Sequence, residues 1–166
     1  MTYPAPFVSS PIAVEEAWID YNGHLNMGYY TVIADRGSDE AFEALGFGPA
    51  YVKQRRCTTY AAEAHICYLR ELHLGAQVSV CFQLLEADEK RIRSMMELRH
   101  QDGWLAATIE VLTLHVDMAG PKVVPFPPDI RANIQAMLAA HAGLPVPARA
   151  GRGIALARKR PADPAG

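Results

Sequence analysis

The chain has 166 residues, of which 50% are hydrophobic and 20% are charged, and its formal net charge is -2. A chain of this length and composition can bury one sizeable core, so we expect a single domain. The slightly acidic balance argues against nucleic acid as a partner, because surfaces that bind phosphate backbones carry an excess of lysine and arginine. A small anionic ligand needs only a few local basic residues and stays open.

The start of the chain and its cysteines indicate where the protein works. Residues 1–10 have neither the basic start nor the apolar stretch of a secretory signal. No uninterrupted apolar run is long enough to cross a membrane. Cys57, Cys67 and Cys81 are odd in number and lack C-x-x-C spacing, which is typical of small buried side chains in a reducing compartment, with a catalytic thiol as the less favoured alternative. We therefore expect a cytoplasmic protein that does not bind membranes.

The first predicted elements lie on either side of a polar turn. Residues 12–19 are partly β-branched and predict a strand, although two glutamates interrupt it. From Met27 to Leu45, apolar or small residues recur every three or four positions, which predicts an amphipathic helix. Gly46 and Pro49 are the residues expected to end this helix.

Four strands are predicted after the helix. Residues 58–69 are rich in β-forming side chains, and residues 77–84 alternate between apolar and polar side chains. Residues 91–100 and 104–117 follow, and the Asp-Gly pair between them is typical of a hairpin. The last three strands should therefore form an antiparallel meander. A short helix over residues 130–141 comes next.

The folded domain is expected to span residues 1–144. In residues 145–166 proline, alanine, glycine and arginine dominate and apolar periodicity is lost, which predicts a flexible tail. The basic run Arg158-Lys159-Arg160 is more typical of a solvated segment than of a site for a phosphorylated ligand. The histidines show no metal-ligand spacing, so we expect no metal site.

The densest group of polar residues lies directly before the long helix. Between Asp20 and Asn26 the chain carries a carboxylate, a turn glycine, an imidazole and a carboxamide. A helix N-terminus offers free backbone N–H groups and a positive dipole end, which can stabilise an oxyanion beside a carboxylate that attacks or activates water. The same residue types form turns and N-caps, so a plain strand-to-helix connection is the alternative.

The order of elements predicts an α+β fold in which an antiparallel sheet buries one face against a long central helix. A single helix cannot cover a wide sheet. We therefore expect the free sheet edge to pair with a second copy, in a homodimer or homotetramer.

Over residues 8–144 the chain resembles the hotdog-fold acyl-CoA thioesterases, in the branch similar to 4-hydroxybenzoyl-CoA thioesterase. The segments that carry this likeness are Asp20-x-x-Gly23-His24-x-Asn26 with Tyr30 in the following helix, the run from Glu63 to Gly75, the run from Ala107 to Asp117, and Pro125-Phe126-Pro127. The resemblance implies a sheet wrapped around a central helix, an acyl-CoA substrate, and no cofactor other than the CoA that the substrate carries.

The resemblance also implies roles for individual residues. Asp20 acts as nucleophile or general base on the thioester carbonyl, and the backbone N–H of Met27 polarises the carbonyl oxygen. His24 and Asn26 orient water or the thioester, although each is also a common turn or cap residue. The remaining expected substrate contacts are Gly23, Tyr21, Tyr30, Glu63 and Tyr68.

A narrower resemblance is to the betainyl-CoA thioesterases of carnitine breakdown, including modules fused to carnitine dehydrogenase. It rests on Trp18–Leu25, Glu63–Leu72 and Leu114–Pro121. A trimethylammonium acyl group requires an aromatic or acidic cage, in which Glu63 is a candidate counter-charge. Ordinary packing is the alternative for each of the candidate aromatic residues, which are Trp18, Tyr21, Tyr29, Tyr30, Tyr60 and Tyr68.

The leading hypothesis is therefore hydrolysis of a small or polar acyl-CoA. The alternative is a hotdog protein that binds acyl-CoA or acts in regulation without catalysis, because one fold can serve both purposes. A dehydratase of the same fold is a third hypothesis, which no specific feature favours.

Overall fold

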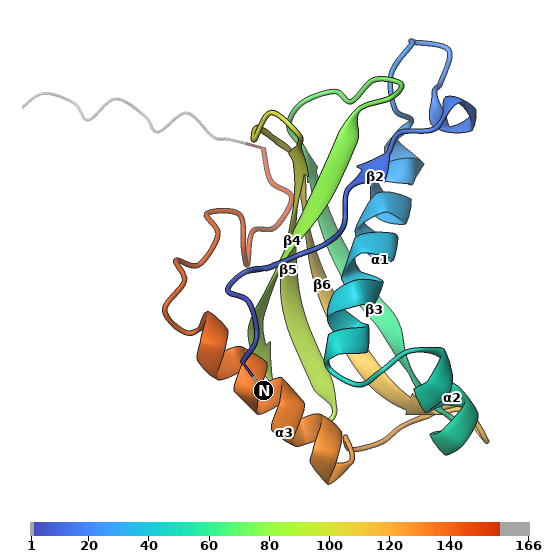
Figure 1. The fold of residues 1–166 in the computed structure, drawn as a ribbon, viewed down its shortest axis with the longest axis vertical. Coiled ribbons are helices and arrows are strands. Elements are labelled where there is room, and N and C mark those ends of the chain that lie inside the picture. The colour runs from blue at the N-terminus through green and yellow to red at the C-terminus, as the bar shows by residue number, and fades with distance from the viewer. Residues whose placement is uncertain (1, 157–166) are drawn as a thin grey trace, which may run out of the picture.

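The computed structural model describes residues 2–156 and consists of an antiparallel sheet against one long helix, α1 (Met27–Ala44) (Figure 1). The strand order is β1-β4-β5-β6-β3, with β2 beside β4 and β7 beside β6. The strands are β1 (Phe7–Val8), β2 (Ile12–Ala13), β3 (Cys57–Tyr68), β4 (Gln77–Ala87), β5 (Arg91–His100), β6 (Leu105–Asp117) and β7 (Lys122–Val123).

The predicted meander is confirmed, because β4, β5 and β6 are consecutive antiparallel neighbours. Gly103 in the turn between β5 and β6 has a φ of 86°, which explains the glycine of the Asp-Gly pair. The other long strand, β3, pairs with β6 and forms the end of the sheet. Its outer edge has no strand partner within the described part of the chain.

Helix α1 confirms the amphipathic segment predicted from Met27. Ile33, Ala34 and Ala41 on its inner face are buried against the sheet. Gly37 lies on the same face, where a Cβ atom would be 2.6 Å from the Cβ of Val80 in β4 and still closer to one of its methyl groups. The glycine therefore allows the helix backbone to touch the strand.

Replacing Gly37 with Ala is expected to lower the free energy of unfolding by about 1–3 kcal/mol, because the new methyl group overlaps Val80 in a packed core. This exceeds the ~1 kcal/mol of helix propensity that alanine gains over glycine. Urea unfolding followed by circular dichroism measures the change. Gly28→Ala is the control, since its Cβ meets nothing closer than the Asn26 Oδ1 at 3.5 Å; equal losses in both variants contradict the packing explanation.

The strand predicted over residues 12–19 is wrong beyond Ala13. Ile12 pairs with Val78, and the N–H of Val14 donates to the Ala76 carbonyl at 2.9 Å, after which the chain leaves the sheet. A single 3-10 turn, η1 (Glu16–Trp18), follows. The two glutamates of this segment are exposed, and their charge favours solvent over a sheet position.

Two helices flank the central one. Helix α2 (Pro49–Arg55) was not predicted, because Gly48-Pro49 was interpreted only as the end of α1; the proline is also the first residue of α2. Helix α3 (Pro128–His141) agrees with the predicted short helix. It packs at the edge of β4, where the His141 Nδ1 accepts from the Leu84 N–H at 2.9 Å.

Residues 145–156 lie on the face of the sheet opposite α1 (Figure 1). The Gly151 N–H donates to the Glu110 Oε2 at 2.7 Å, and the Gln83 Nε2 donates to the Pro145 carbonyl at 3.4 Å. The domain end at residue 144 and the flexible tail stay predictions, and the basic run 158–160 lies outside the described residues.

The cysteines differ from the expectation of full burial. Cys57, Cys67 and Cys81 are half-buried and carry free thiols. Of the helices in residues 2–156, none combines the length and apolar character that crossing a bilayer requires.

Candidate active site

The polar turn before α1 is a tight, hydrogen-bonded loop. The Asp20 N–H donates to the His24 carbonyl and the Gly23 N–H donates to the Asp20 carbonyl, both at 3.0 Å. Gly23 has a φ of 83°, a backbone conformation that favours glycine. The half-buried Asp20 accepts from the Asn22 N–H through Oδ1 at 2.8 Å. Its Oδ2 has no hydrogen-bond partner among residues 2–156, so one carboxylate oxygen is held and the other is available.

The segment that joins β3 to β4 holds this loop in place. The Leu25 N–H donates to the Leu72 carbonyl at 2.7 Å. The His24 Nε2 lies 3.8 Å from the Glu71 Oε1, and the His73 Nδ1 lies 3.3 Å from the Gly23 carbonyl oxygen. The loop is thus fixed to the end of the sheet.

The first turn of α1 lies beside this loop. Asn26 is the N-cap, and its Oδ1 accepts from the Gly28 N–H at 2.9 Å. The Met27 N–H has no acceptor in the described part of the chain. The Tyr68 hydroxyl donates to the Met27 carbonyl at 3.3 Å. The Met27 N–H is therefore free to donate to an oxygen brought to the helix end.

Tyr30 of α1 is bonded to the segment that holds the polar loop in place. Its side chain is 4% exposed, and its hydroxyl donates to the Arg70 carbonyl at 3.4 Å and accepts from the Leu72 N–H at 3.3 Å. Burial is the main reason why the pKa of Tyr30 is raised above its ordinary value. The ring of Tyr68 packs edge-on against Tyr30 at 5.2 Å. The Tyr30 side chain is buried and its hydroxyl is used in hydrogen bonds within the chain, whereas Tyr68 remains partly exposed.

Other predicted substrate contacts lie apart from this group within one chain. Tyr21 is 98% exposed at the tip of the loop. Glu63 is exposed in the middle of β3, five residues from Tyr68 and hence roughly 17 Å along the strand. Trp18 stacks on Tyr29 at 5.4 Å, and the Arg36 guanidinium lies 4.9 Å from the Trp18 ring. The six aromatic residues suggested as a cage are therefore not gathered around one point in the single chain.

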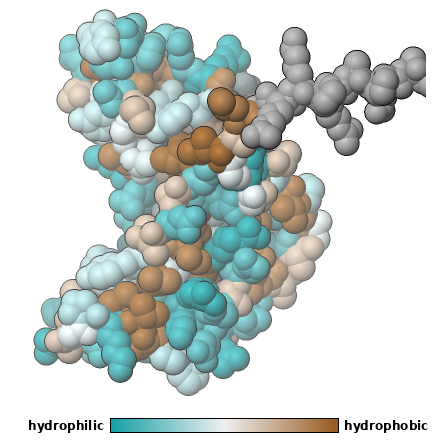
Figure 2. All heavy atoms as spheres, turned by 180° about the vertical axis from the view of Figure 1, so that it is seen from behind, coloured by the Kyte–Doolittle hydropathy of each residue, from teal (hydrophilic) through white to brown (hydrophobic). Residues whose placement is uncertain are grey.

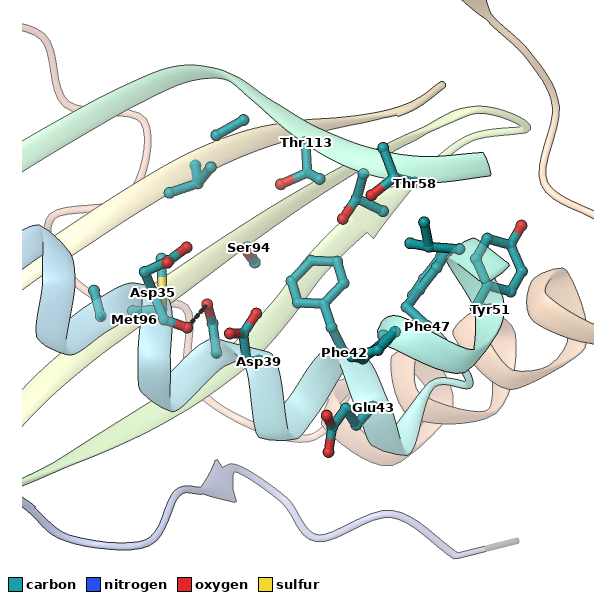
Figure 3. Close-up of a pocket in the computed structure, with 18 of the residues that line it drawn as sticks. Asp35, Asp39, Phe42, Glu43, Phe47, Tyr51, Thr58, Ser94, Met96 and Thr113 are labelled. Atoms are coloured by element: carbon teal, nitrogen blue, oxygen red, sulfur yellow. Dashed lines mark hydrogen bonds between the residues drawn. The ribbon is translucent and has the colours of Figure 1, made fainter. Parts of the chain in front are cut away.

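A cavity of about 730 Å³ lies between α1 and the sheet, and α2 closes one end of it. Figure 2 shows the outer surface hollowed along α1, between the lobe of the polar loop and the lobe of α2. Figure 3 shows Asp35, Asp39 and Phe42 on α1 across from polar side chains of the sheet. The sheet residues that line the cavity are Thr58, Thr59, Ala61, Ala64, Ser94, Met96, Ile109, Val111 and Thr113.

The cavity is acidic on its helix side. Asp35, Asp39 and Glu43 line it, and Lys53 of α2 is the only base among the lining residues, all of which lie in the described range. Burial raises the pKa of Asp39, and the neighbouring Asp35 and Glu43 charges raise it further. At the far end, burial raises the pKa of Tyr51 to about 12, and its hydroxyl lies 2.7 Å from the His115 Nε2.

These acidic residues were missed because carboxylates on the polar side of a helix are usually solvated. The available signal was their spacing: residues 35, 39 and 43 follow one another at four-residue steps and so lie on one stripe of the helix. Within residues 2–156 no group of three histidine, cysteine or acidic side chains could hold a metal ion.

The sheet, the central helix and the carboxylate turn at its start define the hotdog-fold class of protein, and solved structures agree. A Staphylococcus aureus protein determined in complex with CoA has a TM-score of 0.84 at 23% identity, covering 95% of this chain and 100% of that one. A thioesterase candidate from Pseudomonas putida has a TM-score of 0.80 at 29% identity, covering 93% and 99%. The predicted hotdog fold is confirmed.

The sequence model of the thioesterase-like superfamily matches residues 14–134, and the chain belongs to this superfamily. The betainyl-CoA thioesterase of Pseudomonas aeruginosa is 34% identical over 140 residues, which are 84% of this chain and 88% of that protein. The L-carnitine dehydrogenase/betainyl-CoA thioesterase of Rhizobium meliloti is 36% identical over 140 residues. This match covers 84% of the chain but 28% of that longer relative. The predicted class, a thioester hydrolase, is confirmed at the level of the family.

Proposed function

We propose that the chain is an acyl-CoA thioesterase that hydrolyses a small or polar acyl-CoA to the free acid and CoA. The observation that carries the proposal is a half-buried carboxylate, Asp20, with one free oxygen, on a fixed loop beside the unpaired Met27 N–H. Betainyl-CoA is the leading candidate substrate, because two relatives above 30% identity carry that name and one of them matches over most of its own length.

The mechanism needs only residues of the loop and water. Asp20 attacks the thioester carbonyl carbon or removes a proton from the attacking water, and the hydrogen bond from the Asn22 N–H keeps its carboxylate oriented. The Met27 N–H, at the positive end of the α1 dipole, donates to the oxygen as it gains negative charge. Breakage of the C–S bond releases the CoA thiolate. Where Asp20 itself attacks, water then hydrolyses the acyl–Asp20 anhydride to the free acid and restores the carboxylate. A thioester is already activated, so no metal or further cofactor is needed.

The other loop residues have supporting roles in this proposal. Gly23 gives the loop its positive φ, and Asn26 caps the helix so that its first N–H groups stay ordered. His24, whose Nε2 lies 3.8 Å from the Glu71 Oε1, orients the attacking water. Tyr68, exposed beside the helix start, is available to the substrate, and so is Tyr21 at the tip of the loop.

The free edge of β3 supports a homodimer. Residues 60–64 in the middle of β3 are exposed, and three of them are alanines, which allow another backbone to come close. The outer edge of this 12-residue strand has no strand partner within the described residues, and such an edge is an open template for a second strand. Two copies of β3 paired about a two-fold axis extend the sheet across both subunits.

This pairing has a geometric consequence for the site. β3 begins with Cys57, next to α2, and ends at Tyr68, whose hydroxyl contacts Met27 at the start of α1. Antiparallel pairing of two copies brings the partner subunit's Tyr68 close to the Thr58 end of this chain, where the cavity lies. The polar loop of one subunit then faces the cavity of the other.

Release of free thiol from a panel of acyl-CoAs tests the proposal. We expect hydrolysis of short polar acyl-CoAs, with betainyl-CoA among the best substrates, at rates of about 1 s⁻¹ or more. The assay also distinguishes the main alternative, because binding of acyl-CoA without CoA release supports a non-catalytic binding protein. We also expect this activity in the cytoplasm, where acyl-CoA substrates are present.

A further inference from the structure

Resting on the proposed function, we infer that the cavity between α1 and the sheet receives the acyl group and that Asp35 and Asp39 select acyl groups with a fixed positive charge. The chemistry that fits is a quaternary ammonium such as trimethylammonium, close to the thioester carbon. This assigns specificity to the helix face rather than to Glu63 and the aromatic residues near the polar loop.

The three carboxylates of the cavity outnumber its one base, Lys53, so the lining keeps a net negative charge. Asp35, Asp39 and Glu43 form no ion pair with any residue in the range 2–156. The opposite side of α1 differs, because the Arg36 Nη1 lies 3.0 Å from the Glu15 Oε1 and the Glu40 carboxylate accepts from the Ser10 N–H. The acidic side chains that face the cavity are thus the ones left without partners.

The sheet side of the cavity supplies an independent observation. Ser94 of β5 is 1% exposed and Thr113 of β6 is 7% exposed, and both line the cavity. Neither hydroxyl makes a hydrogen bond to another residue of the described chain. Both residues line the cavity, so their hydroxyls are available for hydrogen bonds to a ligand there. Figure 3 shows both across the cavity from Asp35 and Asp39.

The remaining walls suit a large, weakly hydrated cation. Phe42 projects from α1 between Asp39 and Thr58 (Figure 3), and Met96 and Ile109 form an apolar floor. Methyl groups on a quaternary nitrogen pack well on such surfaces, while the charge is attracted to aromatic faces and carboxylates. A cavity of about 730 Å³ is of ligand size and accepts this acyl group with room for the adjoining pantetheine end.

A pair of matched substrates tests the inference. 3,3-Dimethylbutyryl-CoA has the shape of betainyl-CoA, with a quaternary carbon in place of the nitrogen, so the two differ in charge alone. The readout is the ratio of kcat/KM for betainyl-CoA to kcat/KM for the neutral analogue. In the double variant Asp35→Asn with Asp39→Asn we expect this ratio to fall by at least about tenfold, because two carboxylates that line the cavity and attract the cation are removed. Most of the change should appear in KM for the charged substrate.

Glu40→Gln is the matched control, since it removes one charge from the same helix on the face that contacts Ser10. Its ratio should stay within about twofold of the wild type, because Glu40 does not line the cavity and its charge is farther from the cation. An unchanged ratio in the double variant, with both substrates still hydrolysed, overturns the role of Asp35 and Asp39 and leaves the proposed function standing. If the wild-type protein hydrolyses neither substrate, the proposed function fails and this inference fails with it.

Discussion

Replacing Asp20 with Asn is expected to lower kcat for thioester hydrolysis by about 10²- to 10⁴-fold, the usual contribution of a positioned base or nucleophile. The substitution tests the charge specifically, because asparagine keeps an oxygen that can accept from the Asn22 N–H. In the wild-type chain this N–H lies 2.8 Å from the Asp20 Oδ1. The loop should therefore keep its shape while losing the negative charge and the free basic oxygen. Steady-state thiol release measures the loss, and a thermal unfolding curve close to the wild type shows that the fold is intact.

Asp117→Asn is the control for this variant. The Asp117 Oδ1 accepts from the Ala119 N–H at 2.9 Å, which is the same kind of two-residue turn, at the end of β6. Its activity should remain near the wild-type value. Wild-type activity in Asp20→Asn would rule out the assigned chemistry, and equal losses in both variants would point to turn geometry rather than to the carboxylate.

Two defective variants are expected to regain kcat/KM for betainyl-CoA when they are combined in one dimer. In the proposed dimer each site takes its Asp20 from one subunit and its Asp35 and Asp39 from the other. A heterodimer of Asp20→Asn with the Asp35→Asn, Asp39→Asn double variant therefore contains one site with all wild-type residues and one with both defects. Its kcat/KM for betainyl-CoA should be about half that of the wild-type dimer.

Co-expression of the two variants with different affinity tags, followed by purification through both tags, isolates this heterodimer. The parent homodimers, purified in the same way, give the background rates. Activity no higher than these rates would mean that loop and cavity act within one chain. The comparison separates a shared site from a site that each subunit forms alone, which single substitutions cannot do.

The parts of the fold that follow a local period could be predicted from the sequence. The apolar spacing from Met27 onward matches one buried helix face, which includes Ile33 and Ala41. The alternation in β4 and the Asp-Gly turn before β6 are likewise properties of neighbouring residues. In contrast, the extent of β2 depends on how far β4 can pair with it, and two glutamates ended that pairing earlier than the β-branched residues suggested.

The candidate site also has one part that could be predicted from neighbouring residues and one part that could not. Asp20, His24, Asn26 and Met27 are close in sequence, so their grouping could be predicted from the motif alone. The cavity could not, because it is formed where α1 meets residues far away in the chain, such as Ser94 and Thr113. An acidic side chain on a helix is the same in sequence whether it faces water or a cavity. Whether such a side chain faces water or a cavity depends on the sheet that packs against the helix.

The positions of the two described ends bear on how this module can be joined to another enzyme. The Pro4 carbonyl oxygen lies 2.9 Å from the His141 Nε2 of α3, and Gly151 is bound on the back of the sheet through Glu110. Pro4 thus lies near the β4 end of the sheet, away from the open edge of β3, and Gly151 lies over β6 on the face opposite α1. Neither Pro4 nor Gly151 lines the cavity between α1 and the sheet, so a second domain joined beyond them need not cover its opening.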